Sequence, residues 1–118
     1  FVFLAAFSGM TAVARQPLGI ILADADLRRA FASAMAETAA LGRAKGVELS
    51  GDVSERLMSF AGGLPAEMKS SMLHDLEKGK RLEAAWLSGA VSRMSRELGL
   101  AAPVNSTLYA ALKPYAGG

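Results

Sequence analysis

The apolar residues of this chain are mostly of the kinds that favour helices. Ala occurs 23 times and Leu 16 times, whereas Ile, Val and Thr together contribute only 11 residues. Strands favour β-branched and aromatic side chains, while Ala, Leu and Met are strong helix formers. The sequence therefore predicts an all-α fold, and its turn signals divide the chain into about six helices.

Length, cysteine content and charge narrow the class of protein further. A chain of 118 residues is long enough for one domain with a modest core and too short for two. It contains no cysteine, which excludes a disulfide scaffold, a CxxC redox centre and a Cys-based zinc site. This composition fits a reducing compartment, and we expect a cytoplasmic protein. A net charge of +2 without a basic run argues against a nucleic-acid partner.

The chain opens with an apolar run from Phe1 to Ala14, which Arg15 and Pro17 close. A membrane helix needs about 20 apolar residues, so no membrane span is expected. A signal-peptide core that ends at Ala12-Val13-Ala14 is an alternative, although no basic leader precedes it. We favour a piece of a longer protein that starts within a buried helix, because the run is apolar almost all round.

Caps and breakers set the expected helix boundaries. The first helix ends near Arg15, with Pro17 and Gly19 in a loop, and Asp24 or Asp26 opens the second, which Gly46 stops. The remaining helices are expected from a capping box at Asp52–Glu55 to Gly62, from Pro65 to about Lys78, from about Arg81 to Leu98, and from a cap at Asn105 to Leu112.

Three polar residues stand at the edges of predicted apolar faces. Glu83 is in line with Leu87 on the fifth expected helix, and Ser71 and Asp75 lie one turn apart on the fourth. A carboxylate that faces a core needs a donor or a cation, so Glu83 is either a solvated acid at a helix start or part of a ligand cleft. Ser71 either binds a ligand carboxylate or bonds back to a carbonyl one turn earlier.

The sequence Ser71, His74 and Asp75 does not predict a hydrolase triad. These residues fall within five positions of one helix, where their side chains cannot converge. His74, Asp75 and Glu77 likewise do not share a face, so no metal site is expected, and His74 is predicted to be solvated.

The segment from Ser70 to Val91 resembles the C-terminal domain of the ketopantoate reductase (2-dehydropantoate 2-reductase) family. That family has approximately the pattern SSM-x-x-D-x-x-x-G-x-x-x-E, which Ser70-Ser71-Met72, Asp75, Gly79 and Glu83 match in order. Pro103-Val104-Asn105 and Leu108-Tyr109 resemble the tail of the family, and the similarity extends over the whole chain.

The resemblance implies a function. Such enzymes join an N-terminal Rossmann domain, which binds NADPH and is absent from this chain, to a helical C-terminal domain, here residues 1–118. They reduce the ketone of a 2-oxo acid to a 2-hydroxy acid on the route to pantothenate and coenzyme A. By resemblance, Ser71 would bind the substrate carboxylate with Asp75 in support. Glu83 would contact the nicotinamide-side ribose or hold the catalytic Lys, which would fall just ahead of Phe1.

The chain departs from the family at residues that bind the substrate. Two helix Asn positions fall on Leu4 and Ser8, and a third falls near Leu18; Ser8 retains a hydroxyl that can still donate. The resemblance therefore leaves open a relative of ketopantoate as substrate. A non-catalytic helical interaction module is the alternative function. The expected partners are the 2-oxo acid, the Rossmann domain and, as an open option, a second copy; the isolated chain is expected to be inactive.

Overall fold

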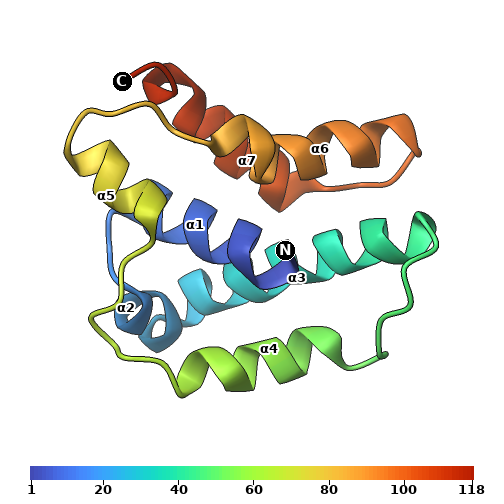
Figure 1. The fold of residues 1–118 in the computed structure, drawn as a ribbon. Coiled ribbons are helices and arrows are strands. Elements are labelled where there is room, and N and C mark those ends of the chain that lie inside the picture. The colour runs from blue at the N-terminus through green and yellow to red at the C-terminus, as the bar shows by residue number, and fades with distance from the viewer.

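The computed structural model describes all residues from 1 to 118 and contains helices without any strand (Figure 1). The prediction of an all-α fold is confirmed, although there are seven α-helices instead of six. They are α1 (Val2–Ala14), α2 (Leu18–Ala23), α3 (Ala25–Ala44), α4 (Val53–Gly62), α5 (Ser71–Glu77), α6 (Ser88–Glu97) and α7 (Pro103–Leu112). Two short 3-10 turns complete the chain, η1 (Ala84–Trp86) and η2 (Lys113–Tyr115).

Helix α1 runs through the middle of the domain. In Figure 1 it lies between the α3 and α4 layer and the α6 and α7 layer, and it contacts α3, α5 and α7. Every residue from Ala5 to Ala12 is buried, as predicted for a helix that is apolar all round. Several of these residues are small, which lets neighbours come close. A Cβ on Gly9 would lie 2.9 Å from Cδ1 of Leu108 on α7.

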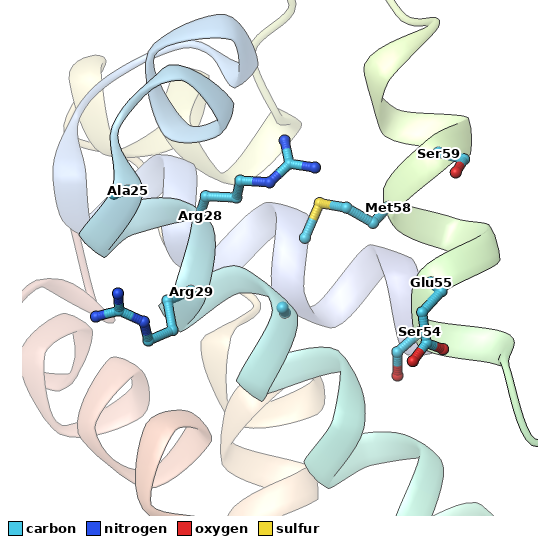
Figure 2. Close-up of a pocket in the computed structure, with 8 residues that line it drawn as sticks. Ala25, Arg28, Arg29, Ser54, Glu55, Met58 and Ser59 are labelled. Atoms are coloured by element: carbon cyan, nitrogen blue, oxygen red, sulfur yellow. The ribbon is translucent and has the colours of Figure 1, made fainter.

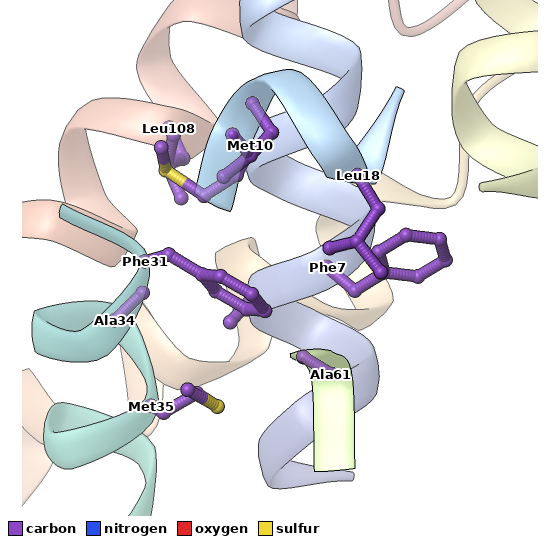
Figure 3. Close-up of a cluster of buried hydrophobic side chains, with 10 residues drawn as sticks. Phe7, Met10, Leu18, Phe31, Ala34, Met35, Ala61 and Leu108 are labelled. Carbon is purple, nitrogen blue, oxygen red and sulfur yellow. The ribbon is translucent and has the colours of Figure 1, made fainter. Parts of the chain in front are cut away.

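The main core fills the space between α1, α2 and α3 and includes one residue each of α4 and α7 (Figure 3). Phe31 and Met35 are completely buried on α3, one turn apart, and Phe7 faces them from α1. Leu18 and Ile21 of α2 close this core. None of the helices is both long and apolar enough to cross a bilayer.

Helix α3 agrees closely with its prediction. The carboxylate of Asp24 accepts a hydrogen bond of 2.9 Å from the backbone N–H of Leu27, so it caps the helix. The predicted apolar face is buried at Phe31, Met35 and Leu41. The backbone of Gly46 turns away with a φ of 88°, which glycine adopts without strain.

Two predictions in the first half of the chain are wrong. Pro17 and Gly19 do not form a loop, because Pro17 is the N-cap of α2 and Gly19 lies inside it. Gly19 is needed there for space, since a Cβ would lie 2.7 Å from that of Ala66. No capping box opens α4, because the side chain of Asp52 accepts no cap hydrogen bond and instead pairs with Arg56 at 3.7 Å.

The boundaries of the later helices also differ from expectation. The fourth expected helix begins at Ser71 instead of Pro65, because the Ser70 side chain provides the cap. The fifth is interrupted, since Leu87, with φ −113° and ψ −99°, separates η1 from α6. Asn105 does not cap a helix but lies buried within α7, whose first turn is bound by a carboxylate from another helix.

That carboxylate belongs to Glu37 of α3. It accepts hydrogen bonds of 2.9 Å from the backbone N–H groups of both Val104 and Asn105, and one of 2.8 Å from the Asn105 side-chain amide. The same amide donates to the carbonyl of Ala34 at 3.1 Å. Glu37 therefore caps α7 from a distant part of the chain and joins the two helices.

Candidate functional site

One serine and one threonine fix the start of α5. The Ser70 hydroxyl accepts a hydrogen bond of 3.1 Å from the backbone N–H of Leu73, and its oxygen lies 2.6 Å from Oγ1 of Thr11 on α1. Thr11 and Ser70 are both buried. Because the cap is tied to the central helix, the next residue, Ser71, is held in a defined place with its side chain exposed.

Glu83 is positioned by a turn that is anchored on both sides. Its neighbours Leu82 and Ala84 are buried, and the backbone N–H of Leu82 donates to the carbonyl of Ala116 at 3.0 Å. The carbonyl of Glu83 accepts from the N–H of Trp86, also at 3.0 Å, and so starts η1. With both neighbours facing inward, the carboxylate of Glu83 lies on the outer side of the turn and is exposed.

Ser71, Asp75 and Glu83 line one hollow with a volume of about 210 Å³, together with Met72 and Leu87. We refer to these five residues as the α5–η1 hollow. It combines one hydroxyl, two carboxylates and two apolar side chains, and neither carboxylate takes part in an ion pair. A small ligand could thus meet a hydrogen-bond donor, an acceptor and an apolar wall within a single cavity.

The sequence had placed Met72 and Leu87 only on apolar helix faces. Met72 follows Ser71 directly, and Leu87 comes four residues after Glu83, so their proximity to the polar residues was visible in the spacing. Met72 belongs to the buried cluster that contains Ala12. Leu87 packs against that cluster and also against the cluster that contains Ala5. The apolar wall of the hollow is therefore continuous with the core.

Ser8 does not line the hollow. Only 1% of its surface is exposed. It lies on α1 between Ala5 and Ala12, and Leu87 packs against the clusters that contain these two residues. Ser8 thus lies on the buried part of α1, behind the apolar wall of the α5–η1 hollow. Leu4, one turn earlier, is 49% exposed.

His74 is exposed, as predicted, and takes no part in the hollow. Its Nδ1 lies 3.9 Å from a carboxylate oxygen of Glu77, and no hydrogen bond joins it to Ser71 or Asp75. No group of three or more His, Cys, Asp or Glu side chains is arranged to hold a metal ion.

The chain matches the family model "Ketopantoate reductase PanE/ApbA C terminal" over residues 1–116. It belongs to the ketopantoate reductase family.

Curated relatives of this reductase domain are longer than the chain. The uncharacterized oxidoreductase YkpB of Bacillus subtilis is 35% identical over 115 residues, which are 98% of this chain and 38% of YkpB. The 2-dehydropantoate 2-reductase of Archaeoglobus fulgidus is 47% identical over 45 residues, which are 38% of this chain and 15% of that enzyme. The chain thus spans about two fifths of YkpB.

Solved reductases of the family have the same fold. The dimeric ketopantoate reductase of Staphylococcus aureus superposes with a TM-score of 0.91 at 25% identity, over 98% of this chain and 40% of that one. The family member from Ralstonia eutropha gives a TM-score of 0.87 at 29% identity, over 98% of this chain and 38% of its own. Residues 1–118 thus correspond to the C-terminal helical domain of these reductases.

Proposed function

We propose that this chain is the substrate-binding domain of an NADPH-dependent reductase that converts a 2-oxo acid, ketopantoate or a relative of it, to the 2-hydroxy acid. The observation that carries this proposal is the α5–η1 hollow. Ser71, Asp75 and Glu83 are separated by up to 12 positions in the sequence, yet they line the same small cavity.

Ser71 is proposed to donate a hydrogen bond to the carboxylate of the acid. Its hydroxyl is exposed in the hollow, and its backbone is held by the cap that Ser70 and Thr11 form. A donor fixed in this way binds an anion at a lower entropic cost than a mobile one. Met72 and Leu87 would contact the carbon skeleton of the substrate, because they form the apolar wall.

Glu83 and Asp75 are proposed to bind a cationic group or a hydroxyl, and not the carboxylate of the acid. NADPH, when bound, supplies the hydride for such a reduction. An unpaired carboxylate at Glu83 fits a ribose hydroxyl or an ammonium group, because it can accept a hydrogen bond from either. Asp75 would support the same cation or hydroxyl from α5. The rest of the cofactor would be held by a nucleotide-binding domain that precedes this one.

Ser8 is proposed as a second, minor substrate-binding residue on α1, although it does not line the hollow. Its burial means that it would act from behind the hollow. A cytoplasmic location is proposed for the whole enzyme, as the cysteine-free composition suggests. We also propose that it pairs with a second copy, since its relative in Staphylococcus aureus is dimeric.

The test is a kinetic one on the full-length protein. NADPH oxidation is followed with ketopantoate and with other 2-oxo acids, for the parent and for Ser71→Ala and Glu83→Gln. We expect measurable turnover of at least one acid, and a fall in kcat/KM of about 10-fold to 100-fold for Ser71→Ala, since a hydrogen bond to a charged group contributes about 1.5–3 kcal/mol. The 118-residue chain alone should be inactive.

Matched controls are available in the loop between α3 and α4, which Figure 1 shows at the other end of the molecule from α5. Ser50→Ala and Glu48→Gln remove an exposed hydroxyl and an exposed carboxylate there and should leave kcat/KM unchanged. If these controls reduced turnover as strongly as Ser71→Ala, the hollow would not be the substrate site.

A non-catalytic interaction module is the second candidate function. It is favoured by the apolar, half-exposed side chain of Leu4 and by Trp86, which is 74% exposed beside the hollow. Large exposed aromatic residues are common in protein interfaces. Turnover of any 2-oxo acid by the full-length protein would exclude this alternative.

A further inference from the structure

Residues 113–118, which we call the strap, lie against the turn that carries Glu83. In Figure 1 the end marked C lies near the segment that follows α5. The carbonyl of Ala116 accepts a hydrogen bond of 3.0 Å from the backbone N–H of Leu82, the residue directly before Glu83. Leu82 is buried, and a buried backbone donor that loses its partner is costly. The position of this turn is therefore linked to the position of the strap.

The end of the strap packs closely on the same turn. A Cβ on Gly118 would lie only 2.8 Å from the carbonyl oxygen of Gly79. The turn begins at Asp75, whose carbonyl accepts a hydrogen bond of 2.8 Å from the N–H of Lys80. The strap thus contacts the connection between Asp75 and Glu83, the two carboxylates of the α5–η1 hollow, at two places.

An aromatic ring stacked on a cation ties the strap to the central helix. The guanidinium carbon of Arg15, the C-cap of α1, lies 5.7 Å from the centroid of the Tyr115 ring. Arg15 has no carboxylate within 4 Å, so its guanidinium is free to interact with the ring. Tyr115 is 48% exposed and packs against none of the buried clusters. Arg15 therefore holds this ring in a place where the apolar core does not.

The strap adds little to the core itself. None of its residues is buried, and the last core residue of this part of the chain is Leu112, directly before it. Its contacts are instead directed to the turn before Glu83 and to Arg15. This distribution favours a role in placing the turn over a role in general stability.

We propose that the strap positions the carboxylate of Glu83 for the reaction, with Tyr115 and Ala116 as positioning residues. This inference rests on the proposed function and adds what places one of its groups. Ser71 is held separately, by the buried cap at the start of α5. The strap therefore acts on the cofactor side of the hollow and leaves the contact with the substrate carboxylate in place.

The experiment follows NADPH oxidation by the full-length protein, by a variant that lacks residues 116–118 and by Tyr115→Ala. The deletion should lower kcat/KM by about tenfold or more, because a displacement of about 1 Å can cost up to about 100-fold. Tyr115→Ala should lower it by about twofold to fivefold, as expected for the loss of an exposed cation–π contact. Tyr115→Phe keeps the ring over Arg15 and should retain the parent value.

The kinetic parameters separate positioning from substrate binding. The loss should fall on kcat and on KM for NADPH, whereas KM for the 2-oxo acid should stay within about twofold of the parent, since Ser71 has not moved.

A second background separates positioning from a structural role. In Glu83→Ala the carboxylate that the strap positions is gone, so the deletion of residues 116–118 should lower kcat/KM by less than about twofold further. A strap that only supported the fold would lower the activity equally in both backgrounds. Circular dichroism would check that every variant folds, which we expect because no residue of the strap is buried.

The matched control is on α4, where Met58 and Ser59 line a separate hollow of about 480 Å³ against α3 (Figure 2). Phe60 follows Ser59 directly and is 54% exposed, similar to Tyr115. Phe60→Ala also removes a half-exposed ring and should leave kcat/KM unchanged, because this hollow shares no residue with the α5–η1 hollow.

The outcomes distinguish this inference from the proposed function. Turnover by the parent with an unchanged kcat/KM in the deletion variant would overturn the role of the strap alone. Equal losses with and without Glu83, or a loss confined to KM for the 2-oxo acid, would do the same. A parent that turns over no 2-oxo acid would overturn both the proposed function and the role of the strap in it.

Discussion

The carboxylate of Glu37 should contribute more to stability than its place near the surface suggests. It accepts three hydrogen bonds of 2.8–2.9 Å, two from the backbone of α7 and one from the side chain of Asn105. Asn105 is completely buried. Glu37→Ala removes all three acceptor contacts at once and leaves the first turn of α7 without a cap.

The expected loss follows from these contacts. Removing a helix cap costs about 0.5–2 kcal/mol. A buried donor left without a partner costs about 1–3 kcal/mol more, and the amide of Asn105 keeps only its bond to Ala34. We therefore expect Glu37→Ala to lower the free energy of unfolding by about 2–4 kcal/mol, a large part of the 5–15 kcal/mol that is usual for a domain.

Urea unfolding followed by far-ultraviolet circular dichroism measures this change. Glu37→Gln keeps one acceptor oxygen and should lose about half as much. Glu97→Ala on α6 is the control, because Glu97 is exposed and in no ion pair, and it should change the free energy of unfolding by less than about 0.5 kcal/mol. A loss for Glu37→Ala no larger than that of the control would refute the reasoning.

Three further predictions concern packing and the cap of α5. Gly89→Ala should destabilise the domain by about 1–3 kcal/mol in urea unfolding, because its Cβ would lie 2.9 Å from the ring of Tyr109. Gly62→Ala, where nothing lies within 4 Å, should instead stabilise it by about 0.4–1 kcal/mol. Thr11→Val removes the hydroxyl that contacts Ser70, so it should lower kcat/KM of the full-length protein through the position of α5; an unchanged kcat/KM would contradict the proposed role of this contact.

The elements that the sequence predicted well are those determined by local pattern. The all-round burial of α1 and the apolar face and Asp24 cap of α3 follow from periodicity and from residues a few positions apart. The cap of α7 could not be read in this way, because Glu37 and Asn105 are 68 positions apart. Local rules therefore assigned a capping role to Asn105 itself, and the distant carboxylate took that role instead.

The same distinction applies to the candidate site. The edges of the apolar faces and the family pattern directed attention to Ser71, Asp75 and Glu83, which line one hollow. The predicted start of α5 was wrong. Proline is common at the first position of helices, which favoured Pro65, whereas the buried contact between Ser70 and Thr11 depends on tertiary structure. The role of Leu87 as a break between η1 and α6 likewise depends on backbone angles that sequence does not show.

The crowded surroundings of α1 bear on how domains of this kind can diverge. Eight consecutive positions, from Ala5 to Ala12, are enclosed, and Gly9 has no room for even a methyl group. Substitutions by larger side chains at these positions should therefore be purged early, and the departure from the family at Ser8 is to a small side chain. New specificities would arise more readily on α5 and around η1, where exposed side chains can change without disturbing the packing of α1. Saturation mutagenesis read by folding should show that most substitutions from Ala5 to Ala12 are rejected, whereas exposed positions of α5 and η1 tolerate substitution.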